Sequence, residues 1–207
     1  MRIGFSELNA SQRYHIMTQV IVPRPIAWVL SDNGLEGDSA YNLAPFSYFN
    51  AISSDPALVM ISTSHKPSGE WKDTRLNILE RKQLVIHIPS VSNMQAVSDS
   101  AATLVHGESE IAAGNLPLTK EEGWHLPRLS DAKIALACHY YDHKEFGPNK
   151  QAVIFCEIED VYVDDEAFSE DQKGRAVIDA SKVDPLSRLG ANAYADFGNV
   201  ITLARPK

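Results

Sequence analysis

Residues 22–64 read VPRPIAWVLSDNGLEGDSAYNLAPFSYFNAISSDPALVMISTS. Residues 26–29 are apolar and β-prone, and Asp32-Asn33-Gly34 follows with residue types that tolerate the positive φ of tight turns. We therefore expect a strand that enters a tight hairpin, with a returning arm toward residues 40–42. Residues 57–61 form a continuous apolar run between Asp55-Pro56 and a polar segment, which is typical of a strand buried on both faces.

The rest of the chain predicts short strands and a few helices. Residues 84–88 indicate a second strand buried on both faces, and residues 74–81 a short helix capped by Asp73. The pattern also predicts a helix at 90–103, a covering loop at 106–128, a long hairpin of 132–141 and 151–163, and a solvated acidic connection at 164–175. These elements predict a mainly β protein, a small antiparallel barrel with peripheral helices.

Composition limits the classes of protein that this chain can be. Its 207 residues are 44% hydrophobic, enough for a full core in one domain spanning 1–207. The formal net charge is -8, and no run of Lys and Arg offers a track for a phosphate backbone, so we expect no nucleic-acid partner. No apolar run approaches the roughly 20 residues of a membrane span, and the N-terminal residues turn polar before an export signal could form.

Cys138 and Cys156 are the two cysteines of the sequence. Two cysteines suit neither a secreted disulfide scaffold nor a thiolate metal cluster, so we expect a cytoplasmic protein. In the predicted hairpin the two residues fall nearly opposite each other. A directly cross-strand disulfide is often strained, and cytosolic thiols stay reduced, so we predict two buried free thiols.

Four short motifs occur in a fixed order along the chain. They are PRPIA at 23–27, NLAPFS at 42–47, SSDP at 53–56 and KDT at 72–74. In this order they resemble the motifs of the flavin-reductase-like, FMN-binding split-barrel family, and Asp184-Pro185 followed by Arg188-Leu189-Gly190 extends the resemblance over most of the chain. The resemblance implies a split β-barrel, FMN as the cofactor and a homodimer with the flavin near the interface.

Two groups of polar residues predict where a phosphate could bind. Ser62, Thr63 and Ser64 follow a predicted strand. Lys72, Asp73 and Thr74 stand at a helix start, where free backbone N–H groups and the helix dipole favour an anion. Read alone, these residues are more typical of an ordinary strand end and a capped helix, because such caps are common. The family resemblance instead implies that the serines and the KDT threonine bind the FMN phosphate.

The NLAPFS segment predicts contacts to a flat ring. Its proline and small residues let the backbone approach a ligand closely. The resemblance implies that the Asn42 side chain, the following backbone of Leu43 and Ala44, and Ser47 lie along the isoalloxazine, with Tyr48 flanking it. Phe49 is better explained as core packing.

The histidines do not indicate a metal site. His139 and His143 lie on a predicted strand, where four residues span about 13 Å, so the two rings cannot share one ion. His87 lies inside an apolar strand and is expected to be a hydrogen-bonded core residue. Some family members place a histidine beside the flavin where this chain has Gln151, and His106 in the covering loop is the alternative candidate.

The resemblance implies an NAD(P)H-dependent flavin reductase. The sequence has no G-x-G-x-x-G fingerprint for a separate nicotinamide domain, so NAD(P)H would stack on the flavin and no catalytic side chain is required. Two alternatives remain open, a non-catalytic FMN carrier or storage protein and an FMN-dependent oxidoreductase acting on a small organic substrate. Arg188 is interpreted equally well as a residue approaching the partner's site or as a member of an ion pair.

Overall fold

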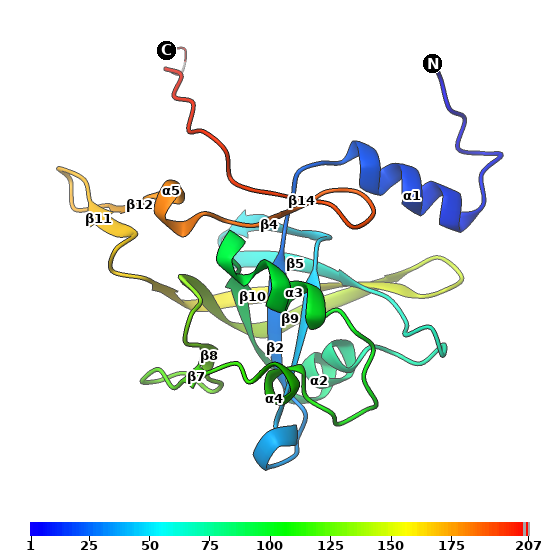
Figure 1. Cartoon of the computed structure of the whole chain (residues 1–207), viewed down its shortest axis with the longest axis horizontal. Helices are drawn as coiled ribbons and strands as arrows, with labels where there is room; N and C mark the ends of the chain where they lie inside the picture. The colour runs from blue at the N-terminus through cyan, green and yellow to red at the C-terminus, as the bar shows by residue number, and fades with distance from the viewer. Residues whose placement is uncertain (205, 207) are drawn as a thin grey trace.

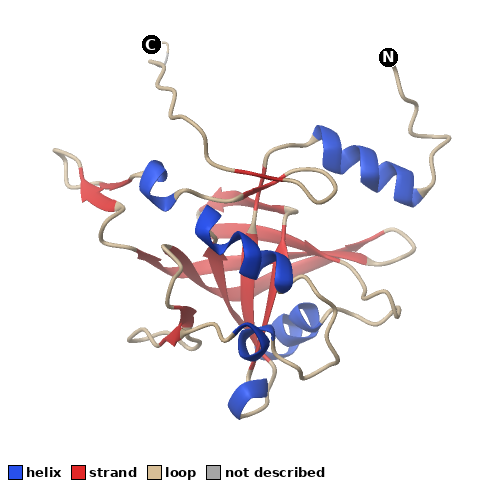
Figure 2. Cartoon of the chain, viewed as in Figure 1, coloured by secondary structure: helices blue, strands red, loops and turns tan. Residues whose placement is uncertain are grey.

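A seven-stranded antiparallel sheet forms the centre of the protein in the computed structural model, which describes residues 1–204 and 206. The strand order is β3-β2-β6-β9-β10-β5-β4. The bounds are β2 (Ala27–Asp32), β3 (Tyr41–Phe46), β4 (Phe49–Ser54), β5 (Ala57–Thr63), β6 (Gln83–Ile88), β9 (Ile134–Phe146) and β10 (Gln151–Val163). The mainly β class with peripheral helices is confirmed (Figure 2).

The sheet curls into a barrel that is open along one seam. Its two edge strands, β3 and β4, are consecutive in the chain and are separated by residues 47 and 48 alone. The Ser62 N–H donates to the Tyr48 carbonyl at 2.9 Å, which draws the end of β5 toward this connection. β3 and β4 do not pair with each other. This arrangement is the split barrel that the sequence predicted.

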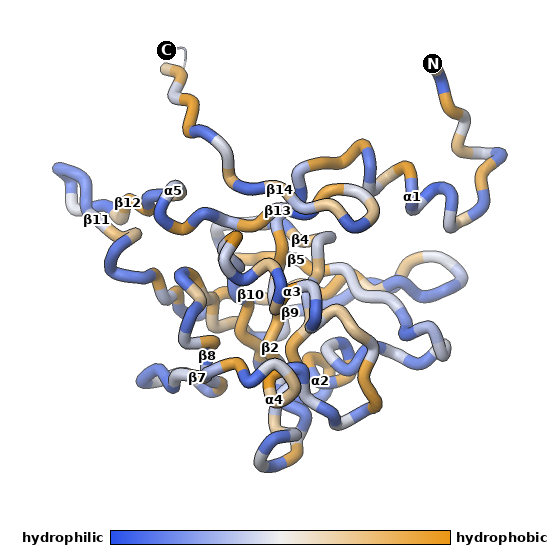
Figure 3. The backbone as a smooth tube through the Cα atoms, in the orientation of Figure 1, coloured by the Kyte–Doolittle hydropathy of each residue, from blue (hydrophilic) through white to orange (hydrophobic). Residues whose placement is uncertain are grey.

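The two faces of the sheet carry separate hydrophobic cores. On β2, Ala27 and Val29 point into the barrel interior, whereas Trp28 and Leu30 point to an outer layer. That outer layer is closed by α3 (Met94–Asp99), by α4 (Glu110–Gly114) and by the chain around residues 116–129. Figure 3 shows the hydrophobic residues gathered along the central strands.

The remaining elements surround the barrel. They are α1 (Ala10–Val20), β1 (Arg24–Pro25), η1 (Gly37–Ser39), α2 (Asp73–Arg81), η2 (Val91–Asn93), β7 (Leu118–Thr119), β8 (Arg128–Leu129), β11 (Phe168–Glu170), β12 (Ala176–Ile178), α5 (Ala180–Val183), β13 (Ser187–Arg188) and β14 (Tyr194–Ala195). Within the described residues, no helix is both long enough and apolar enough to span a membrane.

The turn between β2 and β3 is longer than the sequence predicted. Residues 33–40 form a loop that contains η1, and the Asn33 N–H donates to the Ala40 carbonyl at 2.8 Å. Asn33 is buried because its side-chain oxygen accepts a bond from Asn77 Nδ2 at 2.8 Å. This contact with α2 holds Asn33 inside the protein, so Asp32-Asn33-Gly34 cannot close a two-residue turn.

Burial differs between the two strands expected to be buried on both faces. β6 fits the expectation, since Leu84 to His87 are all buried. On β5, Val59 and Ile61 are buried while Leu58 and Met60 remain partly exposed, so the expectation is wrong for β5. The reason is that the outer-layer helices and loops do not extend over β5.

The structure corrects both predicted helix boundaries. Asp73 is the first residue of α2 rather than its cap; Lys72 holds the cap position without a side-chain cap bond. The helix expected at 90–103 is reduced to η2 and α3. The Ser100 hydroxyl donates to the Val97 carbonyl at 3.1 Å and accepts from Trp28 Nε1 at 2.8 Å, which fixes the chain just after α3 ends.

The long hairpin of β9 and β10 confirms the prediction that the two cysteines are buried free thiols. Cys138 pairs with Ile158 and Cys156 with Tyr140, so the two thiols are diagonal neighbours across the ladder. Both are buried and free. Burial raises the pKa of Cys156 to about 12, which keeps this thiol protonated and unreactive at neutral pH.

Candidate functional site

A cleft lies between the start of α2, strand β3 and the chain after α3. We call it the β3–α2 cleft. Asn42, Ala44 and Pro45 of β3 form one wall, and Lys72, Asp73 and Thr74 form the second. The remaining lining residues are Lys66, Ser100, Ala101, Ala102, Thr103, Leu104 and Glu110. The structure therefore brings together five predicted site residues: Asn42, Ala44, Lys72, Asp73 and Thr74.

A buried hydrogen bond joins the two walls of the cleft. Asn42 Nδ2 donates to Thr74 Oγ1 at 2.9 Å, and both residues are at most 3% exposed. A hydroxyl that accepts one bond can still donate its own proton. Thr74 can therefore donate to an acceptor in the cleft while Asn42 holds it in place.

Lys72 places a poorly solvated cation in the cleft. Its ammonium lies 5.4 Å from the centre of the Phe46 ring, and burial lowers its pKa. Among residues 1–204 and 206, no carboxylate forms an ion pair with Lys72. Because burial disfavours an isolated charge, an anion bound beside Lys72 would stabilise its protonated form.

The start of α2 adds hydrogen-bond donors to the same place. α2 has nine residues, and its first backbone N–H groups have no acceptor within the helix. They carry the positive end of the helix dipole. Together with Lys72 and Thr74, they provide the combination of groups that holds a phosphate.

Asp73 has other partners. Its two oxygens accept from His106 Nδ1 and Lys66 Nζ, each at 2.7 Å. A carboxylate that is ion-paired in this way repels a phosphate less than a free one. Asp73 therefore orders the rim of the cleft, and its predicted direct contact with the cofactor stays a prediction.

Leu43 is also engaged by the protein itself. Its side chain is fully buried in the outer core, and its backbone N–H donates to Glu110 Oε2 at 2.9 Å. Burial raises the pKa of Glu110. The predicted contact of the Leu43 backbone with a ring would thus involve groups other than this N–H.

The three hydroxyl residues at the end of β5 have different environments. Ser62 Oγ accepts from Gln151 Nε2 at 2.8 Å, and Ser64 Oγ is 3.4 Å from the His65 carbonyl. Thr63 is 1% exposed, yet its hydroxyl has no hydrogen-bond partner among the described residues. An unpaired buried hydroxyl is unfavourable, so Thr63 suits a ligand rich in oxygen atoms.

Ser47 and Tyr48 lie outside the cleft lining. Ser47 Oγ is 3.4 Å from Arg24 Nε, and the Tyr48 ring is tilted against Tyr14 of α1 with 6.4 Å between centroids. Burial, followed by Tyr14, raises the pKa of Tyr48. The Tyr48 carbonyl still contacts Ser62, so this connection joins the β5 end rather than the start of α2.

Comparison with known proteins identifies the family. A family model described as "Flavin reductase like domain" matches residues 17–184. The chain belongs to this family. The Bacillus subtilis protein YwrF is 30% identical over 204 residues, covering 97% of this chain and 96% of YwrF.

Two solved structures with the same fold are also 30% identical to this flavin-reductase-like chain. Component B of nitrilotriacetate monooxygenase from Bacillus cereus has a TM-score of 0.86, with 98% of each chain covered. The 2-nitrobenzoate 2-nitroreductase NbaA from Pseudomonas fluorescens has a TM-score of 0.85, covering 100% of this chain and 96% of NbaA.

Some cleft residues of the flavin-reductase-like chain were not predicted. Lys66 stands in the loop between β5 and α2, and its position six residues before Lys72 was a usable signal. Glu110 and residues 100–104 reach the cleft from a different part of the chain. No local pattern indicates this, because their position depends on how α3 and α4 pack on the sheet.

His87 is the hydrogen-bonded core residue that the sequence predicted. His87 is fully buried; its Nδ1 donates to the Trp28 carbonyl and its Nε2 accepts from the Leu129 N–H, both at 2.9 Å. His143 contacts the Tyr140 hydroxyl, whereas His139 lies 3.1 Å from Glu159. No group of three or more metal-binding side chains is found in the part of the chain that the structure describes.

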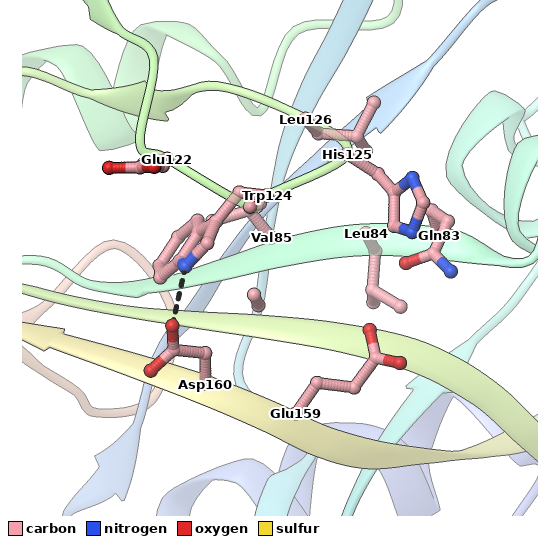
Figure 4. A pocket seen from close by; sticks show the side chains of 11 residues that line it. Gln83, Leu84, Val85, Glu122, Trp124, His125, Leu126, Glu159 and Asp160 are labelled. Carbon is pink, nitrogen blue, oxygen red and sulfur yellow. Dashed lines mark hydrogen bonds between the residues drawn. The ribbon is translucent and has the colours of Figure 1, made fainter.

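A second hollow of about 270 Å³ lies on the outer side of β6, β9 and β10, under residues 122–126 (Figure 4). We call it the acidic hollow, because Glu122, Glu159 and Asp160 line it. The Trp124 Nε1 donates to Asp160 at 2.9 Å across its mouth. None of the predicted cofactor residues lines it.

Proposed function

We propose that the protein binds FMN and is an NAD(P)H-dependent flavin reductase. The observation that carries this proposal is the β3–α2 cleft, which Lys72 and Thr74 line together at the start of α2, where the first backbone N–H groups of the helix are free. Membership in the flavin-reductase-like family supports the choice of a flavin. The unpaired Thr63 hydroxyl fits the same cofactor, since FMN carries phosphate and ribityl oxygens.

Different residues of this chain would bind the phosphate end and the ring of FMN. Lys72, Thr74 and the β5 residues Ser62, Thr63 and Ser64 would hold the phosphate end. The ring would lie along Asn42, Leu43, Ala44, Ser47 and Tyr48, with Asp73 at the rim. FMN held by these residues would supply the redox chemistry, hydride transfer with NAD(P)H. The protein would bind and orient the two molecules, and no side chain would have to donate a proton.

A titration tests the cofactor. If Lys72 and Thr74 hold the phosphate, riboflavin should bind at least about tenfold more weakly than FMN, because hydrogen bonds to charged groups each contribute roughly 1.5–3 kcal/mol. Quenching of flavin fluorescence measures both affinities. Equal affinities would contradict the phosphate assignment while leaving ring binding intact.

We also propose that the protein is a homodimer. On β5 and β10, Leu58, Met60, Val153 and Phe155 face away from the barrel interior and are partly exposed. Phe155 and Met60 are direct partners across the ladder, so the apolar groups form one patch. A second copy would cover it. Light scattering should give about twice the 22.9 kDa of one chain, and a mass of one chain would contradict the dimer.

A specific observation favours a second candidate, an FMN-dependent reductase of a small organic substrate. NbaA, which is named a 2-nitrobenzoate 2-nitroreductase, is 30% identical over nearly its full length. Stopped-flow mixing of the flavin-loaded protein with NADH or NADPH separates the candidates. Turnover of added flavin indicates the reductase, and turnover dependent on an added nitroaromatic acid indicates the second candidate. A yellow protein that neither nucleotide reduces indicates a carrier or storage protein.

The arrangement of the chain supports two remaining proposals. Arg24 near the N-terminus donates to the Leu189 carbonyl at 2.8 Å, so both ends pack on one barrel, as a single domain requires. The two buried free thiols suit a reducing compartment, and we place the protein in the cytoplasm.

A further inference from the structure

Residues 103–109 cross the rim of the β3–α2 cleft on their way from α3 to α4. We call this segment the strap. Thr103 and Leu104 line the cleft. In Figure 1 the green chain after α3 passes beside α2 before it reaches α4. The strap therefore lies where a molecule entering the cleft would have to pass.

Asp73 holds the middle of the strap directly through His106 and indirectly through Lys66. His106 Nδ1 lies 2.7 Å from Asp73 Oδ1, and Lys66 Nζ lies 2.7 Å from Asp73 Oδ2. Lys66 Nζ is also 3.5 Å from the Leu104 carbonyl. The Asp73 side chain is 10% exposed, whereas the His106 side chain is 62% exposed. His106 is thus the solvent-facing member of a contact that fastens the strap to α2.

The far end of the strap is fixed to β3. The Ser109 hydroxyl donates to the Tyr41 carbonyl, and Glu110 accepts the Leu43 N–H. Val105, next to His106, is 70% exposed and belongs to neither core. The strap is consequently held by polar contacts near its middle and its end, with little apolar packing to keep it closed.

We propose that the strap gates flavin exchange and that the His106–Asp73 contact sets how often it opens. This inference rests on the proposed FMN site. Each attachment joins residues of this chain, so it forms with or without flavin in the cleft. Loosening it should therefore raise the rates of flavin entry and exit by the same factor and leave the equilibrium affinity unchanged.

The test is His106→Ala. We expect both the association and the dissociation rate constants of FMN to rise about two- to fivefold, the range for loss of one largely exposed polar contact, with an unchanged Kd. Stopped-flow fluorescence gives association, and the fluorescence recovered after rapid dilution of the FMN complex gives dissociation. His106→Asn keeps an N–H donor near the position of Nδ1 and should restore most of the slow exchange. Val105→Ala, on the same strap, should change neither rate.

Any other outcome contradicts the proposal that the strap gates flavin exchange. A faster dissociation alone, with a weaker Kd, would make His106 a direct flavin ligand. Unchanged rate constants in His106→Ala would show that the His106–Asp73 contact does not control flavin exchange. If the wild-type protein does not bind flavin, the proposed function fails and the gate fails with it. If it binds flavin but His106→Ala leaves both rate constants unaltered, only the gate is contradicted.

Discussion

The β3–α2 cleft and the acidic hollow are both formed where a loop crosses the sheet, yet their charges are opposite. Lys66, Lys72 and the start of α2 contribute positive groups to the cleft, alongside Asp73 and Glu110. The hollow presents three carboxylates with no lysine or arginine among its lining residues. Although the whole chain carries a net charge of -8, the local distribution decides which cavity accepts an anion.

The two cavities also differ in how firmly their walls are held. In the cleft, a buried hydrogen bond joins Asn42 to Thr74. Across the hollow, the bond between Trp124 and Asp160 is exposed to solvent. Buried polar contacts hold geometry more tightly, because breaking them leaves unsatisfied groups. The comparison predicts a preorganised cofactor site in the cleft and a more adaptable surface at the hollow.

The largest expected effect concerns the loop that covers the acidic hollow, which His87 anchors through the Leu129 N–H. Burial lowers the pKa of His87 from 6.5 to about 4. Between pH 6.5 and about 4 the unfolded chain therefore binds a proton on His87 that the folded protein does not. The stability that the neutral His87 contributes is complete above pH 6.5 and is lost as the pH falls toward 4. The difference corresponds to about 3 kcal/mol.

Urea unfolding of the wild-type protein and His87→Gln between pH 7 and pH 4 measures this effect. The variant should be less stable at pH 7 and should lose less stability on acidification. Parallel pH profiles for the two proteins would show that carboxylates, and not His87, cause the acid sensitivity.

In the cleft, Thr74→Val should weaken FMN binding by about 1–2 kcal/mol, because one hydrogen bond to a charged group is deleted. It also removes the acceptor of the buried Asn42 amide, so some thermal stability should be lost. Thr74→Ser keeps the hydroxyl and should recover the affinity. A Thr74→Val protein that binds FMN normally but melts earlier would assign this hydroxyl to the fold alone.

Lys72→Met should weaken FMN binding by about 1 kcal/mol at low salt, and the loss should shrink as salt screens the partly exposed charge. Isothermal titration at two ionic strengths measures this. Lys120→Met removes an exposed charge outside the cleft and serves as the control. Equal losses in the two variants would mean that net charge, rather than the Lys72 ammonium, is responsible.

The smallest effect is expected for Glu159→Gln in the acidic hollow. Changes at distant, independent sites combine within about 0.3–0.5 kcal/mol, so FMN affinity should stay within that range of the wild type. The same titration applies. A clear gain in affinity would mean that the hollow takes part in flavin binding, and the distinction between the two cavities would be wrong.

Local patterns in the sequence predicted most of the strands, because apolar runs such as residues 84–88 report burial directly. They failed where a distant residue decides the outcome. Asn77 draws Asn33 inward and lengthens the turn after β2, and Lys66 and His106 take the carboxylate of Asp73 away from the helix cap. Asn77 is 44 positions from Asn33 and His106 is 33 positions from Asp73, which is beyond the window of residues that a local pattern covers.

The site residues were predicted through a family resemblance, and the structure places some of them in the β3–α2 cleft and others outside it. Asn42 and Thr74 are 32 positions apart and do meet. Ser47 faces Arg24 instead, because the connection between β3 and β4 turns toward α1. Glu110 could not have been found, since it reaches β3 from 67 positions away through the packing of α4.

Arg24 has a consequence for the order in which the chain can fold. It belongs to the PRPIA motif, is 6% exposed, and donates to the carbonyls of Thr18, Ile21 and Leu189. Leu189 lies 165 positions later, so during synthesis this guanidinium cannot have all its partners until residue 189 has left the ribosome. Arg24 can therefore be fully hydrogen-bonded only after the segment that contains Leu189 has been synthesised.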